Sequence, residues 1–114
     1  MLPDITFREL LLWLLRKRKR FRVTGNSMLP LLKPGEEVLI DPNIYQKQRP
    51  EVGDIVIAQH PTQKNLQIIK RVVTVKENNT CLLLGDNPPA STDSRQFGEV
   101  PLSLLQGRVT CRFG

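Results

Sequence analysis

The chain has 114 residues, the usual size of one domain, and a net charge of +6 from 17 basic and 11 acidic residues. Five of the basic residues form one unbroken run, Arg16 to Arg20, and few aromatic residues lie near it. This local excess argues against a nucleic-acid-binding surface, in which basic and aromatic residues interleave. Two cysteines and one histidine are too few for a disulfide framework or a four-ligand metal site, so we expect no metal and no cofactor.

The first predicted element is an amphipathic, basic helix within residues 1–20. Thr6-Phe7-Arg8-Glu9 fits a capping box, and the apolar stretch that follows runs from Leu10 to Leu15 into the basic run. A transmembrane helix needs about 20 apolar residues, and a secretory signal has its charges before the apolar part, so neither is expected. We therefore expect a cytoplasmic protein. The helix either covers the core of the domain, docks a partner, or makes peripheral contact with the inner face of a membrane through residues 5–20.

From residue 21 onward the pattern is that of β structure. Short aliphatic and β-branched runs alternate with turn signals, which is typical of an antiparallel sheet. We predict a mainly β fold, a curled antiparallel sheet or partial barrel formed by residues 21–114, with one N-terminal helix. The strands are expected at 21–23, 37–40, 55–58, 66–75, 80–84 and 108–113, with a turn or short helix at 102–106.

Ser27 is the first candidate for chemistry. It follows Gly25-Asn26, a pair that favours a turn with positive φ, and Pro30 restricts the chain just beyond it. A stiff, bent backbone of this kind presents one hydroxyl and leaves its own N–H free for a ligand. The alternative is an ordinary serine in a turn.

Lys70 is the candidate base for this hydroxyl. Side chains alternate along a strand, so Lys70 shares a face with Leu66, Ile68 and Val72. Holding a lysine neutral near pH 7 costs roughly 4 to 5 kcal/mol, and such a lysine can take a proton from a serine. If the register slips by one residue, Arg71 is inside instead. His60, which a Ser-His-Asp triad would require, has no visible positioning in the sequence.

Three stretches of the chain together resemble the signal peptidase I family of Ser-Lys peptidases. Residues 25–30 (Gly-Asn-Ser-Met-Leu-Pro) resemble the segment that carries its nucleophile. Residues 53–57 (Gly-Asp-Ile-Val-Ile) and 68–73 (Ile-Ile-Lys-Arg-Val-Val) resemble the segment that carries its base. Residues 85–87 (Gly-Asp-Asn) with 91–98 (Ser-Thr-Asp-Ser-Arg-Gln-Phe-Gly) resemble its last conserved box.

The resemblance implies a serine peptidase with a Ser-Lys catalytic dyad, in which Ser27 is the nucleophile and Lys70 the general base. Ser91 would orient the lysine, and Asp93 with Arg95 would brace the site.

On the oxyanion side, the resemblance implies that Met28 packs beside the nucleophile. Asn26 would line the substrate pocket, and the Ser27 N–H would donate to the oxyanion. Some relatives have a serine two positions before the nucleophile. Here that position is Gly25, so a second donor must come from elsewhere.

The sequence differs from the typical family pattern in two ways, and these differences indicate a subfamily. No membrane-spanning anchor is expected before Ser27. Only 16 positions separate Lys70 from Asp86, too few for the inserted β domain of bacterial leader peptidases. This minimal form resembles the nickel-type superoxide dismutase maturation proteases, which implies removal of an N-terminal propeptide from a nickel superoxide dismutase precursor. The alternatives are a membrane-surface signal peptidase that cleaves exported preproteins, and an inactive basic module that binds peptides or membranes.

Overall fold

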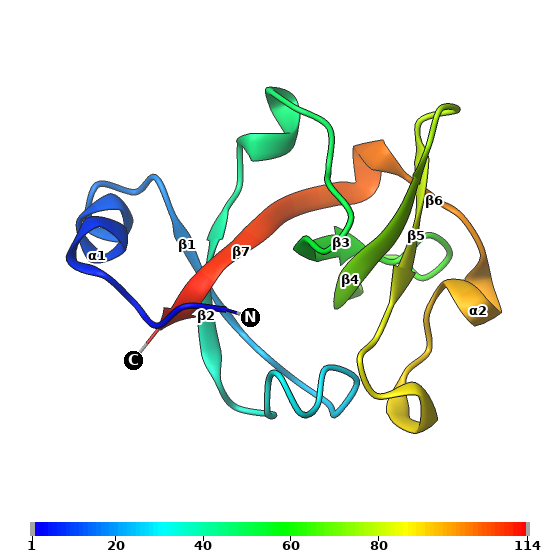
Figure 1. Ribbon diagram of the computed structural model, residues 1–114, viewed down its shortest axis with the longest axis horizontal. Helices are drawn as coiled ribbons and strands as arrows, with labels where there is room; N and C mark the ends of the chain where they lie inside the picture. The colour runs from blue at the N-terminus through cyan, green and yellow to red at the C-terminus, as the bar shows by residue number, and fades with distance from the viewer. Residues whose placement is uncertain (1, 114) are drawn as a thin grey trace.

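The computed structural model describes residues 2–113, which form one seven-stranded antiparallel sheet with a helix at each side (Figure 1). The strand order is β1-β2-β7-β3-β4-β5-β6, so the last long strand lies between β2 and β3. The predicted mainly β fold, a curled sheet with an N-terminal helix, is confirmed. The strands are β1 (Lys19–Arg22), β2 (Glu37–Asp41), β3 (Ile55–Gln59), β4 (Gln67–Lys76), β5 (Thr80–Leu84), β6 (Val100–Pro101) and β7 (Leu105–Phe113).

The helices are short. They are α1 (Phe7–Leu14), α2 (Ser94–Phe97) and three 3-10 turns, η1 (Ile44–Gln46), η2 (Pro88–Ala90) and η3 (Leu102–Leu104). Within the described residues, the structure contains no helix of the length and apolarity that crossing a membrane requires.

Helix α1 ends earlier than the sequence predicted. Thr6 caps its start as expected, accepting the Glu9 N–H at 3.2 Å. The prediction that the helix continues into the basic run is wrong, because Arg16 adopts a φ of 63° and the chain turns there. Lys19 and Arg20 then pair with Ile40 and Leu39 of β2, which supplies the backbone hydrogen bonds that a longer helix would have made.

The side of α1 that faces the sheet is partly polar. The Glu9 carboxylate accepts hydrogen bonds from Arg18 at 3.0 Å and from the Thr110 hydroxyl, instead of completing the capping box. The Trp13 ring meets the Phe113 ring edge-on, with centroids 4.8 Å apart. The opposite side of the helix is apolar and exposed, and consists of Phe7, Leu11, Leu14 and the following Leu15.

Apolar side chains cover both faces of the sheet, because alternate residues of the central strands point to opposite sides. On one face, Ile57 and Ile69 pack with Met28 and Leu32 of the turn that contains Ser27. On the other face, Val56 and Val72 pack with Leu83 and Val100. The turn around Ser27 is therefore anchored in the core, which gives a bent segment a fixed position relative to the strands.

Candidate active site

The turn that carries Ser27 has the geometry that its sequence predicted. Gly25 has a φ of +74°, a conformation that glycine adopts without strain. Met28 and Leu32 are fully buried, and the Leu32 N–H donates to the Met28 carbonyl at 3.0 Å. Met28 thus packs in the core next to the serine, while Ser27 itself remains partly exposed. The buried side chains therefore hold the turn in place, and the Ser27 hydroxyl lies at the surface of a cavity.

The register of β4 places Lys70 inside. Val56 of β3 lies opposite Lys70, whose side chain is only 5% exposed. Arg71 points to the other side, where its guanidinium pairs with Asp86 at 2.9 Å and donates to the Gly53 carbonyl at 3.3 Å. The alternative in which a register slip puts Lys70 in solvent is therefore wrong.

Ser27 and Lys70 line the same cavity, which has a volume of about 290 Å³. They also share a smaller neighbouring cavity of about 180 Å³. Within residues 2–113, no hydrogen bond joins the two side chains. Catalytic hydrogen bonds are often long in a free enzyme and tighten when substrate binds. The residues that line the larger cavity are Gly25, Asn26, Ser27, His60, Gln63, Leu66, Ile68, Lys70, Ala90 and Thr92.

Burial lowers the pKa of Lys70 below its ordinary value of 10.5, because the ammonium loses its water. The charge of Asp93 opposes this shift, and the charge of Arg95 adds to it. None of the ion pairs formed by residues 2–113 includes Lys70. A buried lysine without an ion-pair partner is a suitable proton acceptor, and such lysines are concentrated at functional sites.

Asp93 is the centre of the loop that closes the site. Its carboxylate accepts the Gly85 N–H at 2.9 Å, the Ser91 hydroxyl at 2.7 Å and the Arg95 guanidinium at 2.9 Å. Burial by itself would raise the pKa of Asp93, but these hydrogen bonds outweigh it and hold the pKa well below its usual range. Asp93 also caps α2, so the predicted pairing of Asp93 with Arg95 is present and anchors that helix.

Ser91 lies close to the nucleophile, but its hydroxyl is directed to Asp93. A Cβ added to Gly85 would lie 2.2 Å from the Ser91 Oγ and 2.7 Å from the Ser27 carbonyl oxygen. Glycine at position 85 therefore lets the two loops approach each other. Ser91 is expected to orient Lys70, but a hydrogen bond between the two side chains is not among those that the described residues make.

Asn87 holds the nucleophile turn in place, a function that sequence reasoning missed. Its backbone N–H donates to the Ser27 carbonyl at 2.8 Å, and its side-chain amide donates to the Asn26 carbonyl at 3.0 Å. The Gly-Asp-Asn motif was the only signal in the sequence, and it did not indicate this contact. The Ser27 N–H, in contrast, donates to no acceptor within residues 2–113, as an oxyanion donor requires.

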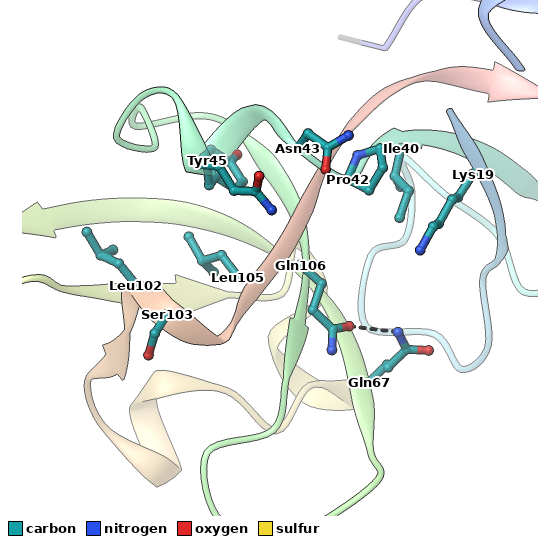
Figure 2. Close-up of a pocket in the computed structure, with 11 residues that line it drawn as sticks. Lys19, Ile40, Pro42, Asn43, Tyr45, Gln67, Leu102, Ser103, Leu105 and Gln106 are labelled. Atoms are coloured by element: carbon teal, nitrogen blue, oxygen red, sulfur yellow. Dashed lines mark hydrogen bonds between the residues drawn. The ribbon is translucent and has the colours of Figure 1, made fainter. Parts of the chain in front are cut away.

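A larger cavity lies elsewhere, with a volume of about 590 Å³ (Figure 2). It also contains a serine and a lysine, but Ser103 and Lys19 lie at opposite ends of it. Two of its lining residues are hydrogen-bonded to each other, since the Gln67 amide donates to the Gln106 side-chain oxygen at 2.7 Å. Lys19 is exposed and keeps its water, so this cavity does not combine a nucleophile with a buried base.

Comparison with known proteins identifies the family. The sequence model described as "Signal peptidase, peptidase S26" matches residues 9–78, which is more than half of the chain. This chain belongs to the peptidase S26 family of signal peptidases. Family members are serine peptidases. The matched segment contains Ser27 and Lys70 and ends before the loop that contains Asp93.

Individual relatives are similar over most of the chain. A mitochondrial ATP-independent inner membrane protease subunit 1b from Arabidopsis thaliana is 36% identical over 110 residues, covering 77% of this chain and 65% of the relative. A mitochondrial inner membrane protease subunit 1 from Xenopus tropicalis is 30% identical, covering 78% and 65%. Signal peptidase I from Buchnera aphidicola is 31% identical over 65 residues, which is 46% of this chain and 21% of the relative.

These relatives refine the resemblance drawn from the sequence. The signal peptidase family is confirmed, whereas the relatives named above are mitochondrial inner membrane protease subunits and a signal peptidase I, and not nickel superoxide dismutase maturation proteases. The chain spans about two thirds of the length of the curated mitochondrial relatives it matches.

Proposed function

We propose that this chain is a serine endopeptidase with a Ser27–Lys70 dyad that cleaves an N-terminal segment from a protein precursor. The observation that supports this most directly is the shared cavity. It contains a serine on a rigid turn and a lysine that is buried, without an ion-pair partner and with a lowered pKa. Membership of the signal peptidase family supports the same reaction.

In the proposed reaction, the neutral Nζ of Lys70 takes the proton of the Ser27 hydroxyl as its Oγ attacks the scissile carbonyl. The carbonyl oxygen becomes an oxyanion and accepts the Ser27 N–H. The Lys70 ammonium then gives its proton to the leaving amine, which breaks the peptide bond and leaves an ester on Ser27. Water, deprotonated by Lys70, then attacks that ester. The Lys70 ammonium returns the proton to the Ser27 Oγ as the ester bond breaks and the second product leaves.

The loop around Asp93 has a supporting role in this proposal. Its carboxylate raises the pKa of Lys70 and so favours the ammonium that forms during the reaction. Ser91 and Arg95 hold the carboxylate in place through hydrogen bonds. We also propose that the Ser91 hydroxyl orients Lys70 when substrate is bound, since Ser91 and the Ser27 carbonyl both lie against Gly85.

The names of the relatives favour a preprotein processed at a membrane as the substrate, rather than a nickel superoxide dismutase precursor. The exposed apolar side of α1 and the basic residues that follow it fit peripheral contact with such a membrane. The superoxide dismutase precursor is the second candidate, supported by the short connection between Lys70 and Asp86.

The test is cleavage of both precursors by the wild type, by Ser27→Ala and by Lys70→Ala, with the new N-termini read by mass spectrometry. Lys76→Ala is the matched control, since Lys76 lies on the same strand and pairs with Glu99 at the surface. We expect the wild type and Lys76→Ala to cleave the preprotein and the two dyad variants to cleave neither substrate. Cleavage retained in both dyad variants would rule out the dyad. Binding of both precursors without cleavage by the wild type would favour the inactive binding module.

A further inference from the structure

The only histidine of the chain organises a loop at the edge of the candidate active site. His60 begins the connection between β3 and β4, and its ring is buried, with the residue 7% exposed. Its Nδ1 accepts the N–H groups of Thr62 at 3.1 Å and Gln63 at 3.0 Å. The His60 N–H donates to the Leu66 carbonyl at 2.8 Å and closes the loop. An Nδ1 that accepts two N–H groups carries no proton, so the ring proton of the neutral imidazole is on Nε2.

The His60 ring also connects this loop with α2. It meets the Phe97 ring edge-on, with centroids 4.9 Å apart and planes at 68°. Phe97 is the last residue of α2, whose first turn is capped by Asp93. The orientation of the imidazole is therefore fixed from two sides, by the aromatic contact and by the two backbone N–H groups.

The loop forms a wall of the substrate site. His60, Gln63 and Leu66 line the cavity that contains Ser27 and Lys70. His60 and Gln63 also line a neighbouring cavity of about 450 Å³, so the two cavities share these residues. The remaining residues of the second cavity are Gln59, Pro61, Thr62, Lys64, Asn65 and Leu104. The exposed lining of this cavity is more apolar than polar.

We infer that His60 is a positioning residue of the peptidase, whose Nδ1 holds residues 60–66 as the wall of a substrate subsite. The inference rests on the proposed function. His60 does not act on the reacting atoms. It acts through the loop, so its loss affects substrate binding more than the chemical step.

Substitutions of His60 distinguish the effect of its Nδ1 acceptor from the effect of its aromatic ring. His60→Asn retains an acceptor, since an asparagine oxygen takes the N–H groups of following residues in an Asx turn. His60→Phe retains an aromatic ring against Phe97 but has no acceptor. We expect His60→Asn to keep a KM within about threefold of the wild type, and His60→Phe to raise KM about tenfold with kcat within about threefold. Should His60→Phe fail to fold, His60→Gln, whose acceptor extends past the Nδ1 position, provides the same comparison.

Hydrogen exchange gives a readout that does not depend on activity. The Thr62 and Gln63 amides should be protected in the wild type and in His60→Asn, and exchange faster in His60→Phe. The Gly53 amide, which donates to the Val72 carbonyl at 2.8 Å, is the internal control. Wild-type KM and wild-type protection in His60→Phe would overturn the inference. Cleavage retained in both Ser27→Ala and Lys70→Ala would instead overturn the proposed dyad, and the exchange result would still report on His60.

The subsite is tested with peptides in which Glu, Gln or Leu occupies each position near the scissile bond in turn. At one position the relative kcat/KM of the three peptides should be the same in the wild type and in His60→Asn, and should differ in His60→Phe. Equal kcat/KM for all three residues at every position would contradict the subsite.

Discussion

Lys70 is buried in a way that destabilises the fold but serves the proposed chemistry. Because its pKa is lower in the folded state than in the unfolded state, the unfolded chain binds more protons between these two values. The free energy of unfolding should therefore rise with pH as Lys70 loses its proton, up to the ordinary pKa of 10.5. Below the lowered pKa of the folded state, the buried Lys70 ammonium, which has no ion-pair partner, destabilises the fold.

We therefore expect Lys70→Met to abolish cleavage and to raise the free energy of unfolding at pH 7 by about 1 kcal/mol. The variant should also lack the rise in stability at alkaline pH. Urea unfolding at pH 7 and pH 9 measures both effects. The control is Lys76→Met, which removes a surface ion pair and should change stability by less than about 1 kcal/mol. A destabilised Lys70→Met that keeps the alkaline rise would contradict this account.

Asp93 has a lowered folded pKa like Lys70, but its charged form stabilises the fold, whereas the charged form of Lys70 destabilises it. Its folded pKa is held below the unfolded value, so its contribution to stability is present above the ordinary pKa of 3.8 and is lost as pH falls toward the folded pKa. Asp93→Asn should lower the free energy of unfolding at pH 7 by about 2 to 3 kcal/mol, since it weakens several charge-assisted hydrogen bonds. Its stability should then depend less on pH in acid. Thermal unfolding from pH 7 to pH 3 tests this, with the exposed Glu77→Gln as a control.

At the scale of elements, the predicted strands agree with the structure more closely than the predicted helix does. Alternating aliphatic residues define strands such as β3 and β5 locally, and these lie within one residue of their predicted bounds. The end of α1 depends on distant partners, because Arg18 turns back to Glu9 and Arg20 pairs with β2. Local sequence signals cannot reveal such contacts.

The same distinction holds for the site. Ser27 and Lys70 each stand in a recognisable motif, so the sequence identified them as candidates. The contacts of Asn87 with the nucleophile turn join residues about sixty positions apart. From the sequence, His60 is an ordinary loop residue, and its contact with the Phe97 ring is visible only in the folded structure. These functions arise from tertiary packing and have no local signature.

The junction between the nucleophile turn and the closing loop should tolerate no side chain at residue 85. A Cβ on Gly85 would lie 2.7 Å from the Ser27 carbonyl oxygen, and a Cβ on Gly107 would lie equally close to the Asp41 carbonyl oxygen. Both alanine variants should be destabilised by about 1 to 3 kcal/mol. Only Gly85→Ala should lower kcat/KM of the folded fraction, because only it displaces the nucleophile. Equal activity per folded molecule in the two variants would show that the contact does not position Ser27.

At the scale of the whole molecule, the positive charge and the exposed apolar residues are both concentrated at the N-terminal end. Arg16 and Lys17, in the turn after α1, are exposed, and so is Lys19, the first residue of β1. Phe7, Leu11 and Leu14 belong to α1, which lies at the opposite end of the molecule from α2 (Figure 1), and they are 80%, 45% and 63% exposed. Apolar side chains beside a basic segment are the combination that binds an anionic membrane surface.

The protein should therefore bind vesicles that contain anionic lipid and not purely zwitterionic vesicles, with affinity that falls as salt is added. Replacing Leu11 and Leu14 by serine should reduce binding to anionic vesicles by about tenfold or more, because burial of each leucine in the interface contributes roughly 1 kcal/mol or more. Val52→Ser is the matched control, since Val52 is 67% exposed in the loop before β3. Cosedimentation measures binding, and cleavage of a short soluble peptide shows that the double variant is folded. If the double variant binds as the wild type does, the membrane contact is not made through α1. Binding that persists at high salt on zwitterionic vesicles would contradict the part assigned to the basic run.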